Sequence, residues 1–187
     1  MRARTCGVLL VTVLVAGCGY NTIQTYDEQV NAAEAQIKVQ LQRRYDLIPN
    51  LVEVVKAYAR QEQTIFTEVA NARARLGGAV QTGSPAEMAD ANQALTGSLS
   101  RLLAIAENYP QLKSNENFKM LQDQLEGTEN RIAVARQDYN EAVNRYNAYI
   151  RRFPQVLTAK MLGKKARQYF EATTPAVDTA PRVNFKN

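Results

Sequence analysis

Residues 118–153 read FKMLQDQLEGTENRIAVARQDYNEAVNRYNAYIRRF, and this stretch decides the fold. Steps of alternately three and four residues from its start reach an apolar series with one polar member, Thr128: Phe118, Leu121, Leu125, Thr128, Ile132, Ala135, Tyr139, Ala142, Tyr146, Tyr149 and Phe153. The spacing predicts a helix roughly 55 Å long with a heptad stripe. Such a stripe must be buried against other helices, which the rest of the chain is expected to supply.

The composition favours helix over sheet and excludes several function classes. The chain has 187 residues, a usual length for one domain, with nine Gly and no Trp. It has no His, so the commonest general base and the His ligands of di-metal bundles are missing. The sequence also lacks a phosphate-binding loop, a dinucleotide fingerprint and a nucleophile with a plausible base. We expect an all-α protein with no catalytic residues, metal or cofactor.

The N-terminus resembles a bacterial lipoprotein signal. Arg2 and Arg4 precede an uncharged run at residues 7–17, GVLLVTVLVAG. The run suits the core of a signal peptide and is too short for a membrane span of about 20 residues. It ends in the letters VAGC, an aliphatic residue and two small residues before Cys18, which is the pattern of a lipobox.

Lipidation of Cys18 would attach the mature chain to a membrane by its first residue. Residues 1–17 are then the signal peptide, and residues 18–29 are the lipid anchor and tether. Each buried methylene of an acyl chain contributes about 0.8 kcal/mol, so two or more chains give stable attachment. Gly19 stands where an Asp usually retains such proteins in the inner membrane of Gram-negative bacteria, which favours the outer membrane. An uncleaved short anchor is the alternative.

The first helical region contains a proline that allows two interpretations. Apolar residues recur with a helical period over residues 30–76. The series has one soft step, by which we mean the polar residue Glu62 at a position where the period calls for an apolar one. Asp46 could cap a new helix that has Pro49 in its first turn. Alternatively, one kinked helix continues through Pro49 at a cost of about 3 kcal/mol.

Glycine, proline and capping residues predict the remaining boundaries. Gly77-Gly78 and Gly83 indicate a loop, and residues 84–87 (SPAE) form a capping box that opens a helix. That helix is expected to stop at Tyr109-Pro110. Four further boundaries are predicted: a cap at Ser114 for the long helix, its end at Pro154, a short amphipathic piece from residue 155 to about 170, and a flexible tail at residues 171–187.

Segment lengths favour an antiparallel four-helix bundle. A bend at residues 46–49 would divide the first region and give four segments of comparable length. The alternative is a long hairpin, in which the segments on either side of Tyr109-Pro110 both run back along one continuous, kinked first helix.

Residues 37–53, IKVQLQRRYDLIPNLVE, resemble the signature segment of the LemA family of bacterial envelope proteins. Further blocks match that family in order and approximate spacing: Tyr20-Asn21, Glu107-Asn108-Tyr109-Pro110, Phe118 with Leu121, Glu129-Asn130-Arg131-Ile132, Ala135-Arg136, Tyr139-Asn140 and Phe153-Pro154. The resemblance implies a helical-bundle domain, here residues 30–170, held at a membrane outside the cytoplasm and without established catalytic activity. Family members commonly use an N-terminal transmembrane helix, which a lipobox replaces here.

The signature segment supplies the first candidate site: Arg43, Arg44, Tyr45, Asp46, Pro49 and Asn50. Its arginines could pair with Asp46 and Glu53, or with carbonyls freed by Pro49, and so form a structural network that pins a bend. A surface that binds a partner is the alternative interpretation. The tyrosines at 139, 146 and 149 are expected in the core.

A basic segment supplies the second candidate site. Residues 142–170 contain no acidic residue and seven basic ones, of which six are candidates for contact with a membrane or a partner: Arg151, Arg152, Lys160, Lys164, Lys165 and Arg167. Both topologies bring them to the anchored end, where each would gain about 1 kcal/mol near an anionic leaflet. A solvated helix end is the alternative. The basic residues do not interleave with exposed aromatics, so nucleic acid is not expected.

These observations predict a non-enzymatic, membrane-anchored lipoprotein that acts as an interaction or scaffold module facing the periplasm or the exterior. Its expected partners are the membrane, through Cys18, and envelope proteins. Two alternatives stay open: an envelope enzyme that uses only carboxylates and Lys, and a module that binds anionic lipid or wall polymer.

Overall fold

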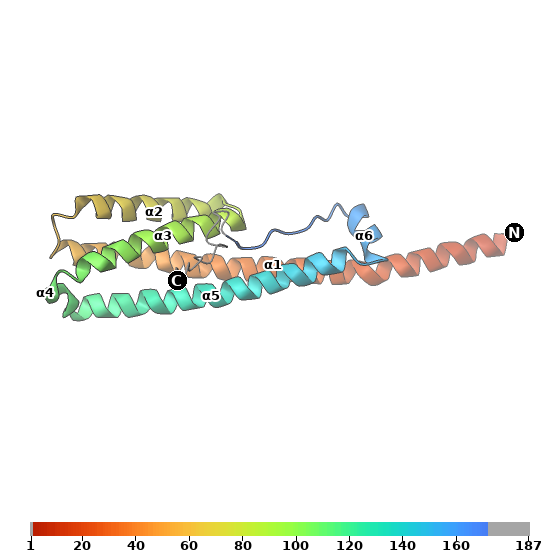
Figure 1. The fold of residues 1–187 in the computed structure, drawn as a ribbon. Helices are drawn as coiled ribbons and strands as arrows, with labels where there is room; N and C mark the ends of the chain where they lie inside the picture. Colours follow the sequence, from red (N-terminus) through yellow and green to blue (C-terminus); the bar gives the residue numbers. More distant parts are fainter. Residues whose placement is uncertain (1, 172–187) are drawn as a thin grey trace, which may run out of the picture.

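A computed structural model describes the backbone of residues 2–171 and the side chains of residues 19–171 (Figure 1). Three of our predictions fall on the remaining positions. Cleavage after residue 17, lipidation of Cys18 and a flexible tail beyond residue 171 all lie outside the described side chains, and they stay predictions.

The described part of the chain is all-α, which confirms the predicted fold class. Six helices and no strand are found between residues 2 and 171. In chain order they are α1 (Arg2–Lys56), α2 (Gln63–Thr82), α3 (Pro85–Ala106), α4 (Pro110–Lys113), α5 (Glu116–Ile150) and α6 (Gln155–Met161).

The two long helices α1 and α5 run antiparallel side by side, and the α2–α3 hairpin covers one end of them (Figure 1). We call the four-helix end the head (residues 41–132) and the two-helix part the stalk (residues 19–40 and 133–150). The short helix α6 contacts both α1 and α5 at the stalk end nearest the N-terminus. The predicted helical bundle is therefore present, with a two-helix extension.

The chain first reverses at residues 57–62, and the predicted bend at residues 46–49 is wrong. Helix α1 continues through Pro49 as far as Lys56, so Asp46 caps no new helix. The continuous first helix of the hairpin alternative is correct, and yet the chain still runs away, back, away and back, as in the favoured bundle. The soft step at Glu62 lies at the true reversal, directly before α2.

The buried stripe of α5 follows the predicted heptad series without a break as far as Tyr139, and Tyr146 is the last buried member of that series. Beyond Tyr139 the buried positions are Val143, Tyr146, Asn147 and Ile150. Consequently Ala142 and Tyr149 are half-buried, and Phe153 is 80% exposed. A straight α-helix drifts by about 20° per heptad, so three heptads rotate the predicted series by about 60° away from the core. Tyr139 and Tyr146 belong to the core, as predicted.

Three of the predicted helix boundaries need correction, the third at the end of α6, while the capping box is confirmed. The Glu87 amide donates to Ser84 Oγ at 3.3 Å, and the Ser84 amide donates to Glu87 Oε2 at 2.6 Å. The cap of α5, however, is Asn115, whose Oδ1 accepts from the Phe118 amide at 3.0 Å. The predicted cap, Ser114, instead donates its hydroxyl back into the preceding turn. Helix α2 also passes through Gly77-Gly78, where a loop was predicted.

Helix α6 ends at Met161, well before the predicted end near residue 170. Gly163 adopts the left-handed conformation, with φ 65°. Its amide donates to the Lys160 carbonyl at 3.1 Å, and the Lys164 amide donates to the Ala159 carbonyl at 2.9 Å. These are the two bonds of a Schellman cap, and they terminate the helix.

After this cap, residues 163–171 form a non-helical segment along the stalk, which we call the strap. Asn147 on α5 bonds the backbone of Arg167 twice, through Nδ2 to the carbonyl (2.9 Å) and Oδ1 to the amide (2.8 Å). The Tyr139 hydroxyl donates to the Gln168 carbonyl at 2.9 Å, and burial raises the pKa of Tyr139 to about 12. Phe170 is fully buried, 6.5 Å from the Tyr139 ring. The strap is thus part of the folded domain.

Residues 19–29 differ from the predicted tether. They belong to α1, Ile23 is fully buried, and Tyr26 meets Tyr149 edge to face at 5.2 Å. The packed domain therefore begins beside residue 18. Among the described residues, no helix has both the length and the hydropathy of a membrane span.

Candidate functional site

The most strongly buried charge of the described residues is Arg44, at the junction of head and stalk. Only 4% of it is exposed. Its Nη1 donates to Asn92 Oδ1 on α3 at 2.6 Å and lies 2.5 Å from Glu129 Oε2 on α5. One guanidinium therefore joins three helices.

The Arg44 cluster is incompletely satisfied. Arg44 Nε and Glu129 Oε2 are buried and have no well-aligned hydrogen bond to any described residue, so the contact between Arg44 and Glu129 is an ion pair at short range. Burial lowers the pKa of Arg44, an effect that the charge of Glu129 partly opposes. An arginine stays protonated in proteins, so this position holds a buried positive charge.

A second cluster surrounds Tyr45. Pro49 has no amide hydrogen, so the Tyr45 carbonyl loses its normal donor one turn further along α1. Arg73 on α2 replaces that donor, because its Nε donates to the Tyr45 carbonyl at 3.0 Å. The Arg73 guanidinium also stacks 3.7 Å from the centroid of the Tyr45 ring, a favourable cation–π geometry. The proline in α1 is thus compensated from α2.

Gly77 allows the Tyr45 ring to approach α2. A Cβ atom at Gly77 would lie 2.9 Å from Tyr45 Cε2, whereas a Cβ at Gly78 would meet no described atom within 4 Å. A glycine inside a helix is normally about 1 kcal/mol less favourable than alanine. Close approach of an aromatic ring therefore explains Gly77.

We expect opposite effects from alanine at these adjacent positions. Gly78→Ala should stabilise the domain by about 1 kcal/mol, because it removes only the helix penalty of glycine. Gly77→Ala should destabilise it by about 1 kcal/mol, because the new methyl group displaces a ring held by Arg73. Chemical denaturation of both variants measures the difference. Stabilisation of equal size at both positions would contradict the proposed packing.

The six residues of the predicted signature site fall into two groups in the structure. Arg44, Tyr45 and Pro49 take part in the two clusters, while Arg43, Asp46 and Asn50 are exposed. The predicted acidic partners of the arginines are engaged elsewhere: Asp46 accepts from Gln42 at 2.9 Å, and Glu53 pairs with Lys56 at 3.4 Å. The two clusters found here therefore differ from the predicted network in their members, and they pin no bend.

Sequence reasoning missed the partners Arg73, Asn92 and Glu129. Glu129 opens one of the blocks that resemble the LemA family, so its position was marked although its role was not. Arg73 and Asn92 lie outside the blocks that resemble the family, so nothing in the sequence singled them out. Their function depends on helices that meet only after the chain has folded.

Two hollows flank the junction of head and stalk. One, of about 600 Å³, lies between α3 and α5, and its lining includes Asn92, Gln93, Thr96, Gly97, Glu129 and Arg136. We call it the junction groove. The other, of about 520 Å³, lies between α1 and α5, and its lining includes Gln36, Gln40, Val134 and Asp138. Amide, hydroxyl and charged groups thus line the surface on both sides of the buried arginine.

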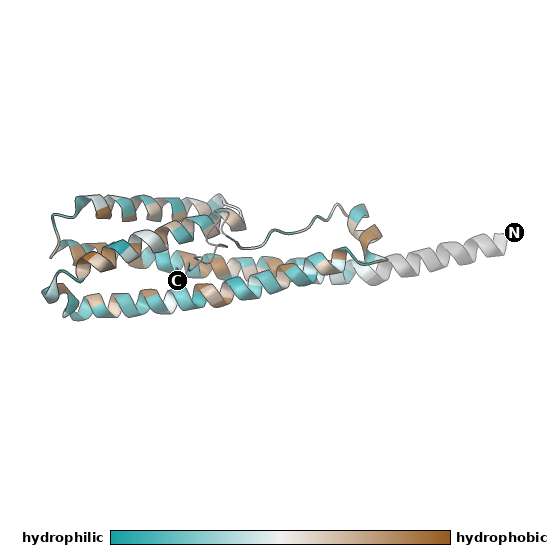
Figure 2. Cartoon of the chain, viewed as in Figure 1, coloured by the Kyte–Doolittle hydropathy of each residue, from teal (hydrophilic) through white to brown (hydrophobic). Residues whose placement is uncertain are grey.

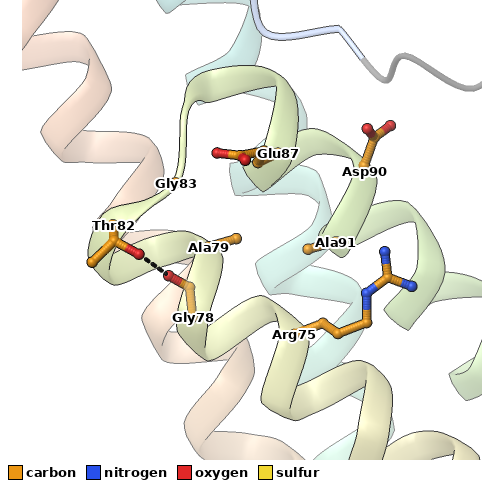
Figure 3. A pocket seen from close by; sticks show the side chains of 8 residues that line it. All are labelled: Arg75, Gly78, Ala79, Thr82, Gly83, Glu87, Asp90 and Ala91. Atoms are coloured by element: carbon orange, nitrogen blue, oxygen red, sulfur yellow. Dashed lines mark hydrogen bonds between the residues drawn. The ribbon is translucent and has the colours of Figure 1, made fainter.

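A third hollow lies at the tip of the α2–α3 hairpin (Figure 3). Two of its polar residues serve the ends of these helices. The Thr82 hydroxyl donates to the Gly78 carbonyl at 3.3 Å, and the Glu87 carboxylate is held in the capping box of α3. This arrangement is structural.

The six residues of the predicted basic site also fall into two groups, one paired with Asp27 and one exposed. In the strap, Lys164 Nζ lies 2.6 Å from Asp27 Oδ2, and Arg167 Nη2 lies 2.8 Å from Asp27 Oδ1. Burial of Asp27 opposes its charge, but the hydrogen bonds and positive charges of Lys164 and Arg167 outweigh it and hold the Asp27 pKa below its ordinary value. These two basic residues fasten the strap to α1. The other four are exposed: Arg151, Arg152, Lys160 and Lys165.

The fold and these clusters define a class of protein: an all-α bundle in which polar clusters join helices to one another. Among the described residues, no group of three or more His, Cys, Asp or Glu side chains is placed to hold a metal ion. The LemA family model matches residues 33–185, and the chain belongs to the LemA family.

Curated relatives carry the same domain. The chain is 30% identical to magnetosome protein MamQ 1 and to magnetosome protein MamQ 2 of Paramagnetospirillum magneticum (strain AMB-1). It is 31% identical to magnetosome protein MamQ of Magnetospirillum gryphiswaldense (strain MSR-1). Each match covers 86% of this chain and 67% of the relative.

Proposed function

We propose that this chain is a non-enzymatic interaction module of the cell envelope, anchored to a membrane through lipidated Cys18. The observation that carries the proposal is the separation of the head from the N-terminal end by the stalk. From residue 19 to residue 40 a helix rises roughly 33 Å, at about 1.5 Å per residue. A module of this shape holds its head away from the membrane surface, facing the periplasm or the exterior.

The junction groove is the proposed partner surface of the head. It combines amide, hydroxyl and guanidinium groups from Gln93, Thr96 and Arg136, which suit hydrogen bonds to a partner's backbone and side chains. Gly97 opens part of its wall, since a Cβ there would meet no described atom within 4 Å. The relatives are named as magnetosome proteins, which agrees with a role in an assembly.

Photo-crosslinking in living cells tests the partner surface. A photoreactive residue at Gln93 should capture an envelope protein, and the same residue at the exposed stalk position Val39 should not capture it. Gly97→Trp, which fills the groove and replaces no member of the Arg44 cluster, should abolish the adduct at Gln93. An adduct that forms equally from Val39, or that survives Gly97→Trp, would contradict the assignment of this groove.

Lipidation has a separate test. Cys18→Ala should leave a longer, unprocessed chain that incorporates no labelled fatty acid, because the lipobox cysteine accepts the lipid before cleavage. The parent chain should be shorter and labelled. Identical mobility and labelling of the two forms would rule out anchoring through Cys18.

A further inference from the structure

Exposed apolar side chains gather around α6. Phe153 is 80% exposed, Leu157 is 55% exposed and Met161 is 87% exposed. The spacing of four residues places Leu157 and Met161 on one face of α6, and Phe153 lies two residues before that helix begins. We call these three residues the foot. Soluble monomers rarely leave such groups clustered in water.

The foot lies beside the N-terminal end of the described stalk. A Cβ atom on Gly19 would sit 3.4 Å from Gln155 Cγ and 4.0 Å from Thr158 Oγ1, so α6 contacts α1 one residue after Cys18. Ala159, on the inner side of α6, is buried. Figure 2 shows hydrophobic residues on α6 at this end of the stalk.

Exposed basic residues lie before, within and after the foot along the chain. Arg151, Arg152, Lys160 and Lys165 are exposed, and no acidic residue occurs between residues 142 and 170. The ion pairs of Asp27 with Lys164 and Arg167 lie just after α6 in the chain, and they hold the C-terminal end of α6 against α1. The foot is therefore a fixed surface with an apolar centre and a basic border.

We propose that the foot inserts into the headgroup region of the anionic leaflet that carries the lipid on Cys18, with the four basic side chains on lipid phosphates. An apolar face with a basic border is the composition of interfacial membrane elements. A second copy of the chain fits less well, because a symmetric contact would bring like charges together. This inference rests on the anchoring part of the proposed function and adds a second membrane contact that fixes the orientation of the stalk.

Tryptophan fluorescence tests the insertion, because the chain contains no Trp. Leu157→Trp places a single probe in the foot. Met120→Trp places a matched probe at another exposed apolar position, at the far end of α5 in the head. Full-length lipidated protein is reconstituted in vesicles of phosphatidylcholine, with or without phosphatidylglycerol, whose acyl chains carry bromine as a quencher.

We expect severalfold stronger quenching at position 157 than at position 120 in vesicles with phosphatidylglycerol, and a decrease at high salt because added salt screens the charges. Gln at all four basic positions of the border should remove the dependence on phosphatidylglycerol. Gln at four exposed basic positions of the head changes the net charge equally and should leave it intact: Arg60, Arg75, Lys113 and Lys119.

Equal quenching at the two positions would overturn the proposal. So would a blue-shifted Leu157→Trp signal that resists the brominated lipid and accompanies a doubled mass in detergent, which would assign the foot to a second copy. Mass spectrometry of the same samples reports the lipid on Cys18. Absence of that lipid would overturn the anchor, whereas a lipidated chain without quenching would overturn only the foot.

Discussion

Glu129→Ala should destabilise the protein by about 3 kcal/mol, a large effect for a residue on the edge of a groove. The reason lies in its partner. The Arg44 side chain is 5% exposed, and Glu129 is its only described counter-charge. Removal of one partner from a buried ion pair leaves an uncompensated charge, which typically costs about 3 to 5 kcal/mol.

The opposite replacement should cost far less. Arg44→Met removes the buried charge together with its unpartnered Nε and keeps an apolar stem of similar length, but it leaves the buried Asn92 Oδ1 without its donor. The two effects oppose each other, so we expect a net cost of at most about 1 kcal/mol. Glu129 tolerates the change because 41% of its side chain is already exposed to water. The two single variants therefore separate a buried charge from an ordinary surface pair.

Urea denaturation of both variants and of the double variant measures this asymmetry. Glu126→Ala, at an exposed glutamate one turn earlier on α5, is the matched control and should stay within about 0.5 kcal/mol of the parent. If Arg44→Met and Glu129→Ala cost equal amounts, the pair would be a net stabilising bridge, and our account of the junction would be wrong.

The parts of the fold that the sequence predicted correctly depend on local patterns. The capping box at Ser84 needs only Glu87, three residues away. The long helix α5 needs only its own stripe, and the sequence placed that stripe correctly over the part of α5 that lies in the head. Such features require no knowledge of a distant partner.

The errors share a different cause. Pro49 and Gly77 are residues that usually interrupt helices, and here both lie inside helices. Arg73 supplies the hydrogen bond that Pro49 cannot give to the Tyr45 carbonyl, and Gly77 leaves room for the Tyr45 ring. Tertiary contacts therefore override the local propensity. The true reversal at residues 57–62 contains neither glycine nor proline. Its only signal in the sequence is therefore the soft step at Glu62.

The same limit applies to the basic segment. Lys164 and Arg167 resemble their neighbours in sequence, but their partner Asp27 lies 137 and 140 residues earlier. A count of charges cannot separate them from the four basic residues that remain exposed. The structure can, and it leaves a smaller basic site that borders an apolar surface.

A related test concerns the compensation of Pro49 by Arg73. Arg73→Met should cost about 2 kcal/mol, because it leaves the Tyr45 carbonyl without its donor and removes the cation on the ring. Pro49→Ala should stabilise the domain by about 1 kcal/mol. That gain is smaller than the usual cost of a helical proline, about 3 kcal/mol, because Arg73 already satisfies the carbonyl.

The two effects should not be additive. In the Pro49→Ala background, the amide of residue 49 can donate to the Tyr45 carbonyl, so loss of Arg73 should cost about 1 kcal/mol less than in the parent. A double-mutant cycle by urea denaturation measures this coupling. Arg75→Met, at an exposed arginine on the same helix, controls for the loss of charge. Strict additivity would mean that Arg73 stabilises only the ring of Tyr45, and that the carbonyl left by Pro49 is satisfied by water.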